Sequence, residues 1–259
     1  MAESPLDIVT GWTGLGEGFE AYQARPEGQD PLGAVVVLPE LFGLNADIRN
    51  VVDRLARDGY AVVAPDIHWR REPRAALPYG DDGRTRGFEL LHGITREEVL
   101  ADIDAARQAA LRLVPGGRAA VLGVSFGGHL AVLAATALPF ALVVSAYGGW
   151  TVHGGIPVAE PLPPMANAPQ IAANGGFLLG FYGELDHAVT ASEVDEIESL
   201  LTEAKVPHAI TRFPGIGHGF LCEGRPDDYD AEAAALTWTR IGSALREQLT
   251  SPGTAAGPR

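Results

Sequence analysis

Cysteine and lysine are almost absent from this chain. Of its 259 residues, one is cysteine, Cys222, and one is lysine, Lys205. A single cysteine excludes an intrachain disulfide and a cysteine cluster for structural zinc. The seven histidines also lack the H-x-H and H-x-x-x-H spacings that many metal sites use. We therefore expect a protein of a reducing compartment that binds no metal.

Positive charge is also scarce, because 19 lysines and arginines face 33 aspartates and glutamates, which gives a net charge of −14. Nucleic-acid binding needs a positive face, so we expect no nucleic-acid partner. No uninterrupted apolar run approaches the length that spans a bilayer. The amino terminus, MAESPLDIVTGW, lacks the basic and apolar regions of a secretory signal. We therefore expect a cytoplasmic protein without a membrane partner.

What the chain does contain is an alternation of apolar β-type runs with amphipathic helices. Strands are predicted at residues 34 to 38, 60 to 64, 119 to 122, 141 to 146, 177 to 182 and 208 to 213. Helices are predicted around residues 48 to 56, from 95 to before 115, and beginning near 126, 190 and 230. This order predicts the α/β class, with a mostly parallel sheet and helices on both faces.

The length suits a single domain, which we place at residues 1 to 250, followed by a flexible tail at 251 to 259. Two long stretches, at residues 67 to 93 and 148 to 174, interrupt the alternation. We expect them to be loops that wall a site. In parallel sheets, ligands bind at the carboxyl ends of the strands. The residues directly after each strand are therefore the candidates for chemistry.

Ser125 follows one of these strands within the sequence GVSFG. A nucleophile on a sharp strand-to-helix turn needs nearly side-chain-free neighbours two residues before and after it, and Gly123 and Gly127 meet that demand. Five letters of this kind arise by chance, but the strand before them and the helix after them predict a nucleophilic serine. The N–H of Phe126, at the start of the helix, can then donate to an oxyanion.

A serine nucleophile needs a general base and a group that orients this base. His218 follows the last predicted strand in the glycine-rich sequence PGIGHGF and is the predicted base. The sequence GELD, after the strand at residues 177 to 182, offers Glu184 and Asp186. Chain order favours Asp186, although either carboxylate can reach an imidazole. The neighbouring His187 is expected to point away.

Four segments make the chain resemble the dienelactone hydrolase family of α/β-hydrolases, from about residue 33 to about residue 245. They are VVVLPELFGLNADIRNVVDRLARDGYAVVAPDIHWR, AVLGVSFGGHLA, FYGELDH and FPGIGHGFLCEGRPDDYDAEAAALTW. The resemblance implies an α/β-hydrolase fold and a triad of Ser125, Asp186 and His218. It also implies that Glu40, with Leu41, faces the nucleophile across the site.

Glu40 and Leu41 directly follow a predicted strand. The N–H of Leu41 is therefore the second expected oxyanion donor, and the Glu40 carboxylate is expected at the strand-end cleft. In family members with a cysteine nucleophile, this glutamate interacts with the thiol. Because serine stands here, we expect His218 to be an ordinary general base. Glu40 is then expected to orient substrate or a water, and a solvated loop carboxylate is the alternative.

Five arginines gather in the first long stretch. They are Arg70, Arg71, Arg74, Arg84 and Arg86. Family enzymes that act on dienelactone bind its carboxylate with arginines, so Arg84 and Arg86 are candidates for binding an anionic substrate. Acidic residues in the same stretch make surface ion pairs the alternative. The family's arginine four residues beyond the catalytic histidine is replaced by Cys222, expected to be buried, and Arg225 comes three residues later.

The sequence therefore predicts a serine hydrolase that cleaves carboxylic esters or lactones through an acyl-enzyme and needs no cofactor. Trp150 and other aromatic residues are expected to shape a partly apolar pocket. Two other functions stay open. One is an acyltransferase or thioesterase with the same triad, and the other is a catalytically silent hydrolase fold that serves as a binding protein. A monomer and a homodimer also both stay open.

Overall fold

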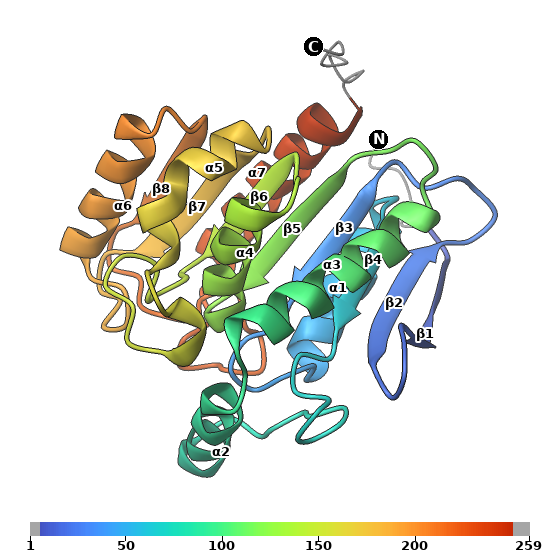
Figure 1. The fold of residues 1–259 in the computed structure, drawn as a ribbon, viewed down its shortest axis with the longest axis horizontal. Helices are drawn as coiled ribbons and strands as arrows, with labels where there is room; N and C mark the ends of the chain where they lie inside the picture. Colours follow the sequence, from blue (N-terminus) through green and yellow to red (C-terminus); the bar gives the residue numbers. More distant parts are fainter. Residues whose placement is uncertain (1–5, 251–259) are drawn as a thin grey trace.

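A single eight-stranded sheet organises the protein (Figure 1). The structure, a computed structural model, describes residues 6 to 250, and the predicted tail at 251 to 259 lies outside them. The strand order is β1-β2-β4-β3-β5-β6-β7-β8, and all pairs from β4 to β8 are parallel. Helices cover both faces of the sheet. The predicted α/β-hydrolase fold with a mostly parallel sheet is confirmed.

All six predicted strands are present to within two residues. The strands are β1 (Ile8–Gly14), β2 (Glu20–Pro26), β3 (Ala34–Leu38), β4 (Ala61–Pro65), β5 (Ala119–Val124), β6 (Leu142–Ala146), β7 (Phe177–Gly183) and β8 (His208–Phe213). The sequence pattern did not predict β1 and β2, an antiparallel hairpin that joins the sheet where β2 pairs with β4. β1 is the edge strand and β2 lies beside it, and most of their residues are exposed or half-buried, so their apolar alternation is weak.

The predicted helices are also present, and two more occur where loops were expected. The helices are α1 (Ala46–Arg57), α2 (Asp81–His92), α3 (Arg96–Arg112), α4 (Phe126–Ala137), α5 (Ala168–Ala173), α6 (Ala191–Glu203) and α7 (Ala231–Thr250). The expectation of uninterrupted loops is wrong for α2 and α5. The sequence of α2 contains two glycines, and its N-terminus at Gly80 has no side-chain cap, so the usual start signal is missing.

Two apolar layers hold the sheet between the helices. The layer on one face joins the sheet to α1 and α7, and the layer on the other face joins it to α3, α4 and α6. Every residue of β3, β4, β5 and β6 is buried, as expected for strands covered on both sides. Chemistry therefore has to take place at the strand ends. Of the helices in the described part of the chain, none has the length and apolar character of a membrane span.

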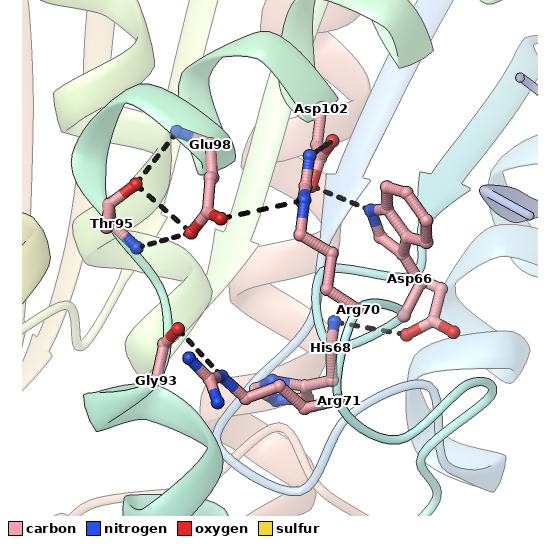
Figure 2. A network of polar contacts seen from close by, with 9 residues as sticks. Asp66, His68, Arg70, Arg71, Gly93, Thr95, Glu98 and Asp102 are labelled. Atoms are coloured by element: carbon pink, nitrogen blue, oxygen red, sulfur yellow. Dashed lines mark hydrogen bonds and ion pairs between the residues drawn. The ribbon is translucent and has the colours of Figure 1, made fainter. Parts of the chain in front are cut away.

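The turn after β4 is fastened to α3 and to the end of α2 (Figure 2). The Arg70 guanidinium binds both carboxylate oxygens of Asp102, at 2.6 and 3.0 Å. Arg71 Nε donates to the carbonyl of Gly93 at 2.8 Å. The ion-pair alternative therefore holds for Arg70, and it also holds for Arg74, which pairs with Glu20 at 2.8 Å. These contacts fix the segment that leads into α2.

Candidate active site

Ser125 occupies a strained turn between β5 and α4. Its φ is +54° and its ψ is −116°, in a region that L-residues rarely adopt. A Cβ on Gly127 would lie 2.1 Å from the carbonyl oxygen of Leu38, and a Cβ on Gly123 would lie 1.8 Å from the carbonyl oxygen of Gly127. Neither position accepts a side chain. The two glycines let the turn pack against the end of β3 and hold the hydroxyl above the sheet.

The hydroxyl of Ser125 contacts the imidazole of His218, which in turn contacts the carboxylate of Asp186. Ser125 Oγ lies 2.8 Å from His218 Nε2, and His218 Nδ1 lies 2.8 Å from Asp186 Oδ2. Because a carboxylate only accepts, the hydrogen-bond network assigns the proton to Nδ1 and leaves Nε2 free to accept from the hydroxyl. Of the two carboxylates that the sequence left open, Asp186 contacts the imidazole and Glu184 is exposed.

The turn after β7 holds Asp186 in place. The residue is 4% exposed, and its Oδ1 accepts N–H groups from Ala188 at 2.7 Å and Val189 at 3.1 Å. The same turn brings the His187 ring to 6.2 Å from the His218 ring, and His187 lines the cavity beside Ser125. The expectation that His187 points away is wrong, because a turn does not alternate its side chains as a strand does.

Both residues predicted to supply oxyanion donors lie beside Ser125. Leu41 and Phe126 line the cavity with Ser125. Phe126 is the first residue of α4, where backbone N–H groups have no intrahelical acceptor. The close approach of Gly127 to the carbonyls of Leu38 and Pro39 brings the segment that carries Leu41 against this turn. The two N–H groups therefore come from the two segments that meet at the nucleophile.

A cavity of about 240 Å³ opens above Ser125. It is lined by Leu41, Phe42, Arg84, Phe88, Ser125, Phe126, Trp150, His187, Ala188, His218 and Arg225. Its wall is mostly apolar and aromatic, so the structure places Trp150 where the pocket was expected. Within residues 6 to 250, no group of three histidine, cysteine, aspartate or glutamate side chains gathers as metal ligands would.

Comparison with known protein families matches residues 19–249 to the dienelactone hydrolase family. The chain belongs to this family. A protein of Synechocystis sp. named "Putative carboxymethylenebutenolidase" is 33% identical over 230 residues, which cover 88% of this chain and 91% of that protein. A protein of the same name from Escherichia coli K12 is 32% identical over 253 residues, which cover 93% and 88% of the two chains.

A solved structure agrees with this assignment. The structure described as "Putative Dienelactone Hydrolase" from Klebsiella pneumoniae has a TM-score of 0.80 and 29% identity, covering 92% of this chain and 98% of that one. The prediction of a hydrolase of the dienelactone hydrolase type is confirmed.

The arginines differ from the family-based expectation. Arg84 lines the cavity, but Arg86 pairs with Glu72 at 2.8 Å and Glu89 at 2.7 Å. Two residues along a helix turn the side chain by about 200°, so Arg86 faces away, and its assignment to substrate binding is corrected. Arg225, which the sequence analysis left unassigned, lines the cavity and pairs with Asp228 at 2.5 Å. The sequence signal that could have indicated this role is that Arg225 comes three residues after Cys222, the position where the family has an arginine.

The expectation that Glu40 orients substrate or a water at the strand-end cleft is corrected, because Glu40 is not among the residues that line the cavity. It is 1% exposed, so the alternative of a solvated loop carboxylate is wrong. Its Oε1 accepts from Asn45 Nδ2 at 2.9 Å and lies 2.7 Å from the Tyr79 hydroxyl, while Oε2 lies 3.8 Å from Cys222 Sγ. Cys222 is buried as predicted, and burial raises the pKa of its thiol well above the usual range. Glu40 thus makes its contacts inside the protein, beside the strand end.

Proposed function

We propose that this protein hydrolyses small carboxylic esters or lactones with Ser125 as the nucleophile. His218 is the general base, and Asp186 orients its imidazole. The observation that carries the proposal is the pair of 2.8 Å contacts from Ser125 Oγ to His218 and from His218 to Asp186. A hydroxyl is a weak nucleophile by itself, and this arrangement supplies the base and the tautomer that activation requires.

The reaction has two halves. In the first, Ser125 Oγ bonds to the carbonyl carbon while its proton passes to His218 Nε2. The oxyanion of the tetrahedral intermediate accepts from the N–H groups of Leu41 and Phe126. The bond to the leaving oxygen then breaks, and His218 gives its proton to that oxygen. In the second half, His218 takes a proton from water, water attacks the acyl carbon, and Ser125 leaves with the proton restored.

The cavity favours a compact substrate with some negative charge. Its volume of about 240 Å³ suits a small molecule, and the aromatic rings of Phe42, Phe88 and Trp150 suit an apolar or unsaturated body. Arg84 and Arg225 line the same space, and a guanidinium binds a carboxylate well. The names of the two curated relatives, which describe action on a lactone, point in the same direction.

The test is a panel of p-nitrophenyl acetate, p-nitrophenyl butyrate, dienelactone and a second anionic lactone. It uses the wild type, Ser125→Ala and Ser125→Cys, with Ser199→Ala as a control because Ser199 is an exposed serine on α6. We expect Ser125→Ala to lower kcat at least about 1,000-fold, and Ser199→Ala to leave it unchanged. Full activity of Ser125→Ala would contradict the proposal. A wild type that is inert and unlabelled by a fluorophosphonate would favour the silent binding fold.

A further inference from the structure

Beside the cavity, three segments of the chain meet at the hydroxyl of Tyr79. This oxygen lies 2.7 Å from Glu40 Oε1 and 2.5 Å from Asp47 Oδ2. It also accepts from Asn45 Nδ2 at 3.0 Å. The amide of Asn45 is oriented independently, because its Oδ1 accepts from the N–H of Ile48 at the start of α1. The Nδ2 atom therefore faces both Tyr79 and Glu40 as a donor.

The number of protons at this junction is too small if both carboxyl groups are charged. A tyrosine hydroxyl carries a single proton and can donate it to only one acceptor at a time. Asn45 already supplies the tyrosine oxygen with a donor. Two ionised carboxylates at 2.5 and 2.7 Å from this oxygen would leave one close contact between lone pairs with no hydrogen between them. One of the two carboxyl groups therefore carries a proton.

The surroundings identify Glu40 as the protonated group. Asp47 lies in the first turn of α1, where the helix dipole favours negative charge, and the N–H of Gly224 lies 3.1 and 3.2 Å from its two oxygens. Glu40 is 1% exposed, and burial raises the pKa of its carboxyl group. The titratable and charged groups that face it are Tyr79, Asp47, Cys222, Tyr147 and Arg225.

Hydrogen bonds from Tyr79 and Asn45 to Glu40 favour its ionised form, and so does the positive charge of Arg225. Its charge is shared with Asp228, whose carboxylate lies 2.5 Å away. Desolvation therefore remains the larger effect on Glu40.

We propose that Glu40 is a neutral acid that donates to Tyr79, that Tyr79 donates to Asp47, and that this chain of hydrogen bonds positions the active site. At one end it holds the segment that carries Leu41. At the other end it reaches Gly224, next to Arg225. Glu40 and Tyr79 are thus positioning residues, and Glu40 does not serve as a base. The activity part of this inference rests on the proposed function.

The arrangement has a defined pH dependence. A buried acid whose pKa is raised keeps its proton at low and neutral pH and loses it as the pH rises through the raised value. Ionisation of Glu40 would place two negative carboxylates around one hydroxyl proton and push the two segments apart. We therefore expect kcat/KM to fall at alkaline pH through this ionisation, and Glu40→Gln to remove that fall because an amide does not ionise.

Glu40→Gln and Asp47→Asn form the matched pair that tests the assignment. The amide of Glu40→Gln still donates to Tyr79 and loses only the contact with Asn45, so kcat/KM at neutral pH is expected to fall about fivefold. Asp47→Asn removes a charged acceptor that serves both Tyr79 and Gly224, and is expected to cost on the order of 10- to 100-fold. The melting temperature of each variant separates these effects from loss of folding.

Infrared spectroscopy tests the proton without any substrate. The difference spectrum of wild type minus Glu40→Gln is expected to contain the C=O band of a protonated carboxyl group at neutral pH and to lose it at alkaline pH. Absence of the band at neutral pH would overturn the proposal, as would a larger loss of activity in Glu40→Gln than in Asp47→Asn. A wild type inactive on all esters, with the band present, would contradict only the proposed function.

Discussion

Asp186 uses its two carboxylate oxygens for different purposes. Oδ1 accepts backbone N–H groups from Ala188 and Val189, which hold the side chain in its turn. Oδ2 accepts from His218 Nδ1 and so sets which imidazole nitrogen is free for Ser125. The residue therefore combines a structural contact with control of a tautomer. A substitution that keeps one oxygen can separate the two.

Asp186→Asn makes this separation. Its oxygen can keep the backbone contacts, but its NH₂ group then faces His218 and forces Nδ1 to accept. The Nε2–H then points at Ser125 and cannot take its proton. We expect kcat to fall about 1,000- to 10,000-fold with little change in melting temperature. Glu184→Gln, on the exposed carboxylate of the same turn, is the control and should behave as wild type. Equal losses in both variants would contradict this role.

At the scale of elements, α2 forms part of the wall of the cavity above Ser125. It packs directly on the segment that carries Leu41, because a Cβ on Gly87 would lie 2.7 Å from Leu41 Cγ. The contact from Arg71 to Gly93 fastens its C-terminal end. From this fixed helix, Arg84 and Phe88 line the cavity. The helix is therefore a wall of the site rather than a loop over it.

Two arginines on α2 provide a matched comparison. Arg84 lines the cavity, and Arg86 pairs with Glu72 and Glu89 on the exposed side. We expect Arg84→Ala to raise KM for an anionic lactone about tenfold, because one charge-assisted contact is lost. KM for p-nitrophenyl acetate should not change. Arg86→Ala should leave both values within about twofold, because exposed ion pairs contribute little. An equal rise of KM for neutral and anionic substrates in Arg84→Ala would count against charge recognition.

At the scale of the whole molecule, buried histidines link stability to pH. The His68 side chain lies in the fastened turn after β4, where its backbone N–H donates to Asp66 (Figure 2). The residue is 2% exposed, and burial lowers its pKa to about 4. The unfolded chain therefore binds a proton at a higher pH than the folded protein does. This contribution to stability is complete above about pH 6.5 and is lost as the pH falls towards 4.

The free energy of unfolding, measured by urea unfolding, is expected to fall between pH 7 and pH 4.5 in wild type. In His68→Phe we expect this fall to be smaller by about 2 to 3 kcal/mol. Burial raises the pKa of Asp66 to about 6, so protonation of Asp66 favours the folded state as the pH falls, opposite to the effect of His68. The pH dependence of wild type is therefore compared with that of the variant. The exposed His153, replaced by Gln, is the control. If the unfolding free energy of wild type and His68→Phe changed equally with pH, burial of the His68 ring would not be the cause of the loss of stability at low pH.

The sequence determined the parts of this protein that depend on local pattern. Fully buried strands are continuous apolar runs, and the capping groups Asn45, Thr95 and Thr190 mark helix starts by short-range hydrogen bonds. Ser125 between its glycines, and Asp186 and His218 after two later strands, could be named as candidate site residues for the same reason. Strand order in a parallel sheet brings such strand-end residues to one edge.

Only the tertiary structure decided which of these candidates meet. The choice of Asp186 over Glu184, the outward direction of Arg86 and the place of Arg225 depend on contacts between segments distant in the chain. The edge hairpin and α2 were missed because their stability comes from packing rather than from their own pattern. The burial of Glu40 against Tyr79 follows from the same cause, since 39 residues separate them in sequence. Long-range packing leaves no local periodicity for a sequence pattern to show.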